Sequence, residues 1–296
     1  MSLLRLFFRL AFSFSVLLPW QWVWGWGFEG HKLINREAVK LLPGHLGAYF
    51  LQEISYLSEH AIDPDLWVGD EEGHPLEGRG HYIDADLYDD YPFRKIPRNW
   101  DELLATYGEE NVDRWGTAPW RIDRYFHRLI EEFRQGNWEE ARLTAAALGH
   151  YVSDLHMPLH VVQNYDGQLS GNTGIHRQWE ADMVDHFLLE KIHPEGKVVI
   201  ISDPVEEVFR IVEESYPLHG AILRADSLAR GKLSASDRAK IAHKEASMEG
   251  TGYLETLVAE TGDLARARME KAAFRVASFW YSAWVEAGRP APPHRD

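Results

Sequence analysis

Apolar residues recur at helical spacing along most of this 296-residue chain, and this pattern constrains the fold more than any other feature. In residues 119–134 the spacing predicts an amphipathic helix, because one helical face carries Ile122, Tyr125, Phe126, Leu129, Ile130 and Phe133. Gly136 and Asn137 then break the chain. A second helix is predicted over 138–156, where Pro158 stops it.

The same reading covers the rest of the chain. A long C-terminal helix is predicted from Ala265, Met269, Ala272, Val276, Trp280 and Ala283, closed by Gly288 and Pro290. The helical spacing also places the tryptophans of FWYSAW in the core. Further helices are predicted over 31–42, 45–60, 176–191 and 204–214, and a strand only over 198–201. With no repeat or long linker, an all-α fold in a single multi-helix domain over 26–290 is expected.

The first 25 residues differ from the rest of the chain. Arg5 and Arg9 are the only charged residues before Glu29, and an apolar run over 11–18 leads to the small residue Gly25. This order predicts a cleavable secretory signal peptide over 1–25 and a secreted or periplasmic protein. The alternative is an uncleaved membrane anchor, but the apolar run is shorter than the ~20 residues that a membrane span needs. No stable membrane insertion is expected after cleavage.

Composition excludes several kinds of site. The chain contains no cysteine, which excludes disulfides, thiolate metal sites and a cysteine nucleophile. The full chain carries 31 basic and 46 acidic residues, and without Arg5 and Arg9 the formal charge is −17. Such a surface repels polyanions, so stable binding to duplex nucleic acid is not expected.

Histidine and aspartate occupy one face of the predicted helix 138–156. His150 and Asp154 are four residues apart and follow Leu143 and Ala147 on the same apolar face. A buried carboxylate costs several kcal/mol unless a cation pairs with it. The cation could be a metal ion, or His150 could pair with Asp154 in a purely structural contact. This pair alone leaves both interpretations open.

A second group favours a metal. His176 and Glu180 are again four residues apart, and His160 lies upstream, just beyond Pro158. Two histidines and one carboxylate suit a zinc site that keeps a position open for water or substrate. Three more fragments contribute candidate ligands, namely WGFEGH with His31, HAIDPDLW with Asp65 beside Asp63, and GRGHYIDAD with His81. His156 points away from Asp154 and is expected at the surface or beside a ligand.

The order of these fragments resembles the superfamily of bacterial zinc-dependent phospholipase C and fungal single-strand-specific nucleases. Its members are all-α proteins whose helices and long loops surround a cleft with three zinc ions. Trp26 matches the family's mature N-terminal tryptophan, which binds metal through its own amine and carbonyl. The other matching positions are His31, Asp65 after Pro64, His81, His150, Asp154, His160, His176 and Glu180.

The resemblance implies three zinc ions per chain and assigns their ligands. One zinc would be held by Asp65, His81, His150 and Asp154. A close neighbour would be held by Trp26, His31 and Asp154, so that Asp154 bridges the two. The third would be held by His160, His176 and Glu180. Asp65 and Asp154 are therefore expected to act in catalysis, with a hydroxide bridging two zincs as the nucleophile.

The resemblance implies a phosphodiester hydrolase, and its details favour a phospholipase C. Glu180 in place of aspartate and the absence of cysteine resemble the bacterial phospholipases, and Val68 stands where nucleases carry an arginine. Tyr82 resembles the nucleases, so a single-strand endonuclease or 3'-nucleotidase is the alternative. A non-catalytic secreted zinc-binding protein is the second alternative. The expected partner is a small phosphodiester or phospholipid, with single-stranded nucleic acid as the alternative and no obligate protein partner.

Overall fold

The computed structural model describes residues 26–70, 72–189, 192–242, 248 and 250–293. Within these ranges the chain forms helices and connecting loops, with no strand. The helices in chain order are α1 (Gly27–Leu41), α2 (Gly44–Gln52), α3 (Ile54–Glu59), η1 (His60–Ile62), α4 (Asp63–Trp67), η2 (Glu77–Gly80), α5 (Ala85–Tyr88), α6 (Trp100–Tyr107), α7 (Glu109–Trp115), α8 (Ala118–Gln135), α9 (Trp138–Asp154), η3 (Pro158–Val161), α10 (Ile175–Arg177), the π-helical turn η4 (Gln178–Asp182), α11 (Met183–Phe187), α12 (Pro204–Ser215), η5 (Tyr216–Leu218), α13 (His219–Gly231), α14 (Ala235–Ala242) and α15 (Tyr253–Glu286).

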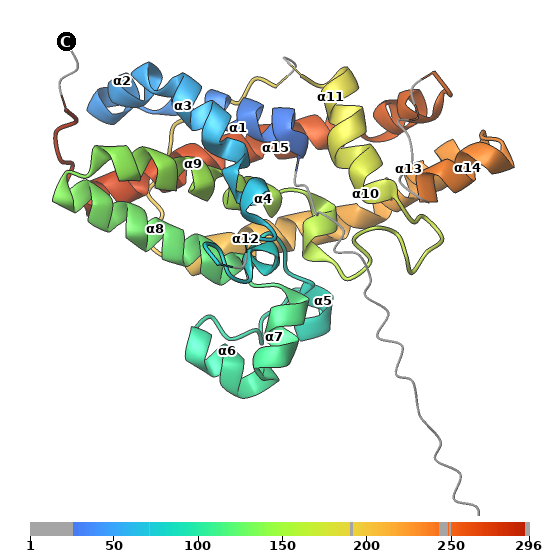
Figure 1. Ribbon diagram of the computed structural model, residues 1–296, viewed down its shortest axis with the longest axis horizontal. Helices are drawn as coiled ribbons and strands as arrows, with labels where there is room; N and C mark the ends of the chain where they lie inside the picture. The colour runs from blue at the N-terminus through green and yellow to red at the C-terminus, as the bar shows by residue number, and fades with distance from the viewer. Residues whose placement is uncertain (1–25, 71, 190–191, 243–247, 249, 294–296) are drawn as a thin grey trace, which may run out of the picture.

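Helices α8, α9 and α15 form the centre of the molecule. Gly136, with a φ of 71°, ends α8 and lets α9 fold back beside it (Figure 1). The predicted apolar face of α8 is buried, and α15 packs against both helices and against α1. The prediction for FWYSAW is confirmed, because Trp280 is buried and its indole donates to the carbonyl of Ala145 at 2.8 Å.

Helix α1 is held against α9 by a buried amide. The Asn35 side chain donates to the carbonyl of Leu57 at 3.0 Å and to that of Ala146 at 3.1 Å, so it ties α1 to both α3 and α9. Gly149 of α9 lies directly against this amide, where a Cβ atom would collide with it. The close approach brings the N-terminal half of α1 beside the C-terminal end of α9.

A small helical protrusion, formed by α5, α6 and α7, extends from the body between α4 and α8 (Figure 1). Asn99 caps α6 by accepting a hydrogen bond from the amide of Glu102 at 3.1 Å. The hydroxyl of Tyr88 donates to the carbonyl of Gly116 at 2.9 Å and ties the protrusion together. These short helices were not predicted from the sequence.

The predicted strand over 198–201 is wrong. This segment has no regular structure and lies along α15, where the amide of Val199 donates to Ser278 Oγ at 3.3 Å and that of Ile201 to Ser282 Oγ at 2.8 Å. The serine hydroxyls of α15 therefore accept the backbone hydrogen bonds that the carbonyls of a neighbouring strand would accept in a sheet.

Two predicted helices are correct in place but not continuous. The helix expected over 45–60 is divided at Glu53 into α2 and α3, and the helix expected over 176–191 contains η4 and ends at Phe187. The signal peptide predicted over 1–25 lies outside the described residues. Among the described helices, none combines the length and apolar character needed to cross a membrane.

Candidate metal centre

The eight side chains predicted as metal ligands come together at the end of α9. All are buried, with relative exposures of 5% or less, and they are His31, Asp65, His81, His150, Asp154, His160, His176 and Glu180. Helix α1 contributes the first, α4 the second, α9 the pair His150 and Asp154, and the segments after η2, in η3 and in α10–η4 the rest. The four-residue spacing could group only residues of the same helix, such as His150 with Asp154. The fold brings these pairs together with the candidate ligands from other segments.

Asp154 lies at the middle of the first group. Its Oδ1 atom is 3.3 Å from His31 Nε2, while its Oδ2 atom is 3.1 Å from His81 Nδ1 and 3.2 Å from His150 Nε2. The rings of His31 and His150 stack with their centroids 3.9 Å apart. The two oxygens of the Asp154 carboxylate thus face different imidazoles, Oδ1 facing His31 and Oδ2 facing His81 and His150.

Asp65 completes this group from the opposite side. Its Oδ1 atom lies 3.7 Å from His81 Nδ1 and 3.6 Å from His150 Nε2, and neither of its oxygens has a hydrogen-bond partner among the described residues. Asp63 points elsewhere, because its Oδ2 atom pairs with His60 Nδ1 at 2.7 Å.

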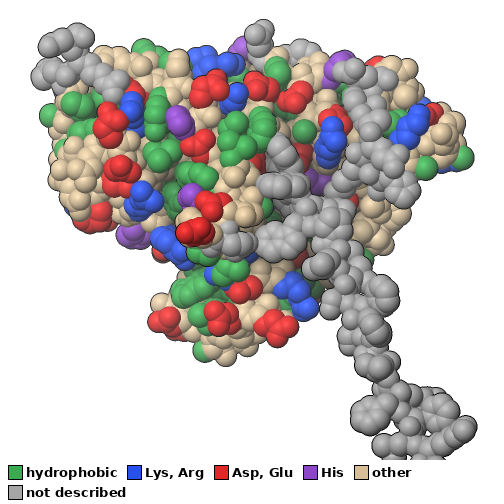
Figure 2. Space-filling view, viewed as in Figure 1, with side chains coloured by type: hydrophobic (Ala, Val, Ile, Leu, Met, Phe, Trp, Pro, Cys, Tyr) green, Lys and Arg blue, Asp and Glu red, His purple; other side chains and the backbone are tan. Residues whose placement is uncertain are grey.

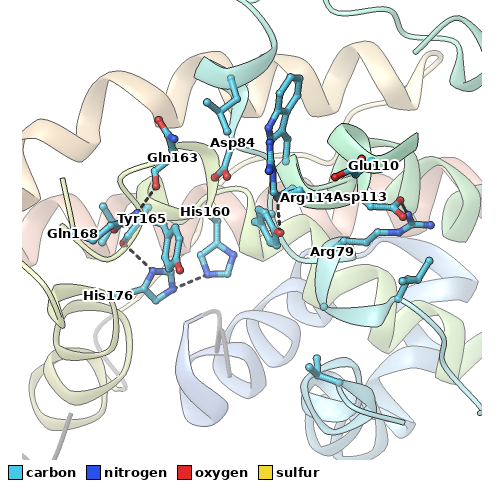
Figure 3. Close-up of a pocket in the computed structure, with 17 residues that line it drawn as sticks. Arg79, Asp84, Glu110, Asp113, Arg114, His160, Gln163, Tyr165, Gln168 and His176 are labelled. Carbon is cyan, nitrogen blue, oxygen red and sulfur yellow. Dashed lines mark hydrogen bonds and ion pairs between the residues drawn. The ribbon is translucent and has the colours of Figure 1, made fainter. Parts of the chain in front are cut away.

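The second group lies beside the first. His160 Nε2 is 3.1 Å from His176 Nε2, and Glu180 Oε2 is 2.9 Å from His176 Nε2 and 3.4 Å from His160 Nε2. Figure 3 shows the two imidazoles meeting at the floor of a cavity. Glu180 lies in the π-helical turn η4, a local widening of the helix that often occurs at functional sites.

Most of the histidines are oriented by the backbone. In three of them the Nδ1 atom donates to a backbone carbonyl. His150 donates to Ala61 at 2.8 Å, His160 to His81 at 2.8 Å, and His176 to Tyr165 at 3.0 Å. His31 Nδ1 lies 2.8 Å from Ser153 Oγ, which itself donates to a carbonyl and therefore accepts from His31. Each of these rings turns Nε2 toward the centre, as metal-binding histidines do.

The charges in the centre depend on one another. Burial and the neighbouring His150 lower the pKa of His31 to about 3. Burial raises the pKa of Asp65, whereas for Asp154 the effect of burial is outweighed by His150 and by hydrogen bonds from three histidines, and its pKa falls well below the usual value. The buried carboxylates of the centre carry negative charge that a bound cation would neutralise.

The donor atoms fit zinc. Three sets of side chains offer ligand atoms within 4.8 Å of one another, namely His31–Asp65–His150, His81–His150–Asp154 and His160–His176–Glu180. All donors are nitrogen or oxygen, which are the ligands available to zinc in a chain without cysteine.

Trp26 and His156 occupy defined places near the centre. The indole of Trp26 is buried, donates to the carbonyl of Ser153 at 2.8 Å and packs on Trp179 with ring centroids 5.4 Å apart. Coordination by its main-chain atoms stays a prediction.

His156 was expected at the surface or beside a ligand. It is fully buried next to Arg268, whose Nε donates to the His156 carbonyl at 3.0 Å, so the first of these two positions is wrong.

A cavity of about 870 Å³ opens onto His160 and His176 (Figure 3). Its apolar and aromatic lining includes Val68, Leu76, Tyr82, Leu87, Trp115, Leu159 and Tyr165, and its charged lining is Arg79, Asp84, Glu110, Asp113 and Arg114. Arg79 pairs with Asp113. Burial and the nearby Asp86 raise the pKa of Asp84 to about 7. The cavity is large enough for a small organic substrate.

Comparison with known proteins places the chain in a family. None of the curated proteins matches it. A sequence profile of the family described as zinc dependent phospholipase C matches residues 30–223, which is more than half of the chain and includes all eight clustered side chains. The chain therefore belongs to the zinc-dependent phospholipase C family and is a zinc hydrolase that acts on phosphoester bonds.

Proposed function

We propose that this protein is a phospholipase C that hydrolyses the bond between glycerol and phosphate of a glycerophospholipid and releases a phosphorylated headgroup that carries a cationic amine. The observation that carries this proposal is the wall of the cavity beside His160 and His176. It combines three aromatic side chains with Asp84, Glu110 and Arg114, and its two remaining charged residues, Arg79 and Asp113, pair with each other.

The proposed zinc ligands are Trp26, His31, Asp65, His81, His150, Asp154, His160, His176 and Glu180. Zinc in such a site polarises a phosphoryl oxygen and lowers the pKa of a bound water. The chain contributes rigidity, because backbone carbonyls hold three imidazoles in a single orientation. It also shields the ligand atoms from bulk solvent, since every one of the clustered side chains is buried. Asp154 serves both neighbouring sets of nitrogens with one carboxylate.

The charge of the cavity favours an ammonium group over a phosphate chain. Asp84, Glu110 and Asp113 line it, and Arg114 is the cation in this lining that has no carboxylate partner among the described residues. Tyr82, Trp115 and Tyr165 also line the cavity, and an aromatic ring whose face meets a cation contributes about 0.5–2 kcal/mol. Figure 2 shows basic side chains interspersed with acidic ones on the face in view. With 31 basic and 46 acidic residues, the chain as a whole does not attract a polyanion.

A single-strand nuclease is the second candidate, and Tyr82 is the observation that favours it. The Tyr82 ring lines the cavity, and its hydroxyl donates to the carbonyl of Arg114 at 3.1 Å, which fixes the ring. A fixed ring could stack an unpaired base for about 1–3 kcal/mol. Stacking would have to overcome the repulsion between the strand and the neighbouring carboxylates.

The test is a matched set of substrates at moderate ionic strength. Catalytic efficiency is measured on short-chain phosphatidylcholine, phosphatidylethanolamine and phosphatidylglycerol and on a single-stranded oligonucleotide, with and without a chelator. We expect the two cationic headgroups to be preferred, and Asp84→Asn to reduce their advantage over phosphatidylglycerol.

Two outcomes would replace this proposal. If the oligonucleotide is the best substrate and Tyr82→Ala removes that advantage, the protein is a nuclease. If zinc-loaded protein cleaves none of these substrates and no chromogenic phosphodiester, it is a zinc-binding protein without this activity.

A further inference from the structure

We propose that Glu77 is a positioning residue that holds His81 in the orientation required of a zinc ligand. This inference rests on the proposed role of His81 in the metal centre. His81 differs from the other four histidines of the centre in the way its ring is turned. Its Nδ1 atom faces the centre, 2.9 Å from His150 Nε2 and 3.1 Å from Asp154 Oδ2, and its Nε2 atom faces outward, 3.5 Å from Glu77 Oε1.

The outward nitrogen of His81 therefore meets a charged carboxylate. In the four other rings the outward nitrogen donates to a carbonyl or to a serine hydroxyl. A carboxylate that accepts from the outer N–H of a ligating imidazole fixes its tautomer and raises the basicity of the nitrogen that faces the metal. His81 Nε2 is buried and makes no hydrogen bond with the described residues, and Glu77 Oε1, 3.5 Å away, is the carboxylate oxygen placed to accept from it and so to do both.

Two further donors hold the Glu77 carboxylate in place, one on the oxygen that faces His81 and one on the other oxygen. Its side chain is 2% exposed, a position in which an unpaired carboxylate would be strongly unfavourable. The hydroxyl of Tyr151 donates to Oε1, and Arg121 Nη1 donates to Oε2 at 2.7 Å.

The short segment EGRGH builds this contact. Glu77 and His81 are four residues apart across η2, which brings the two side chains together. Gly80 lies under the guanidinium of Arg121, whose Nε atom would be 2.8 Å from a Cβ atom at this position. The glycine thus leaves room for Arg121 to reach Glu77 from α8.

The chain offers a matched control. Glu53 is also 2% exposed and also pairs with an arginine, with Oε2 2.6 Å from Arg142 Nη1. It lies between α2 and α3, outside the cluster of proposed ligands. Glu53→Gln and Glu77→Gln therefore remove the same charge from similar surroundings, and only one of them touches His81.

The experiment measures zinc affinity by chelator competition, the absorption spectrum of the cobalt-substituted protein, and the unfolding temperature. The variants are Glu77→Gln, Glu53→Gln and the double variant Glu77→Gln/Arg121→Gln, which also removes the arginine left without a partner. We expect about 10–100-fold weaker binding of one zinc and an altered cobalt spectrum in both Glu77 variants. Glu53→Gln should lower the unfolding temperature and leave both metal readouts unchanged.

The double variant separates positioning from stability. If it regains the unfolding temperature of the wild type and still binds one zinc weakly, Glu77 acts on the metal through His81. Wild-type zinc affinity and an unchanged cobalt spectrum in either Glu77 variant would overturn the inference. His81→Ala tests the underlying site separately, because loss of one zinc in that variant keeps the proposed ligand set even if Glu77 proves dispensable.

Discussion

The two oxygens of Asp154 face different partners, His31 on one side and the pair His81 and His150 on the other. Removing this carboxylate leaves the two sets of nitrogens without their shared anion. We expect Asp154→Ala to be the most damaging single change, with loss of at least one zinc per chain. Its effect on activity should exceed the ~10–100-fold typical of residues that only support a ligand. Metal analysis of the purified variant is the check, and a wild-type zinc content would contradict the bridging role.

The two aspartates of DPDLW make a sharper comparison, because they lie in one helical turn and differ in what they touch. Asp65 is buried against His81 and His150, whereas Asp63 pairs with His60 and is 21% exposed. Asp65→Asn should weaken zinc binding and abolish most activity, and Asp63→Asn should change neither by more than about threefold, since partly exposed ion pairs contribute little. Equal or reversed losses of zinc affinity would show that the ligand has been assigned to the wrong aspartate.

At the scale of single residues, the sequence reveals what local spacing can encode. His150 and Asp154, or His176 and Glu180, share a helix face and can be recognised from four-residue spacing alone. Glu77 could have been noticed four residues before His81, but it gives a signal only once Arg121 and Tyr151 reach it. The carbonyls of Ala61 and Tyr165 give no signal at all, because every residue has a carbonyl and only the fold selects these two.

At the scale of elements, the contact between α1 and α9 determines whether His31 reaches Asp154. Gly149→Ala places a methyl group against the Asn35 amide that ties the two helices together. We expect a loss of roughly 1–3 kcal/mol in stability from overpacking, reduced by the ~1 kcal/mol that alanine gains over glycine in a helix. Zinc affinity should fall as well, because α1 carries His31. Both are measured by denaturant unfolding and chelator competition.

Gly231→Ala is the control for this prediction. Gly231 ends α13, and no atom outside its own helix lies within 4 Å of a Cβ atom placed there. The substitution should leave zinc binding unchanged and stability unchanged or slightly higher. If Gly149→Ala is equally harmless, the close approach of α1 and α9 is not what positions His31.

The helices with long amphipathic patterns were predictable, and the interruptions were not. Helices α8, α9 and α12 lie within two residues of the predicted ranges. Helix α15 ends close to the predicted Gly288, but it begins at Tyr253, well before Ala265, the first position from which it was predicted. The break at Glu53 and the π-helical turn η4 leave the spacing of apolar residues almost unaltered. The spacing therefore predicts one continuous helix across each of them. Helices α6 and α7 are only about two turns long, which is too short for a clear apolar pattern. Their formation depends on the Asn99 cap of α6 and on contacts within the protrusion.

At the scale of the whole molecule, the expected N-terminus matters for the metal centre. Trp26 is packed between Ser153 and Trp179, next to Asp154. We predict that the mature protein begins at Trp26 and holds three zinc ions, because the proposed ligand is the free amine that cleavage after Gly25 creates. Intact mass and metal analysis of exported protein test this. A fully active, fully metallated protein that retains the preceding residues would contradict it.

Helix α15 has a consequence for the time at which activity arises. It packs on α1, α8 and α9, and it follows all of them in the chain, so it is synthesised after them. A nascent chain that already includes every proposed ligand, from Trp26 to Glu180, still lacks the surface that presses their helices together. We therefore expect capture of zinc to depend on the synthesis of α15 rather than on the appearance of the ligands. If residues 1–25 direct the unfolded chain across a membrane, as the sequence predicts, this order would keep a phosphoester hydrolase inactive until it has left the compartment in which it was made.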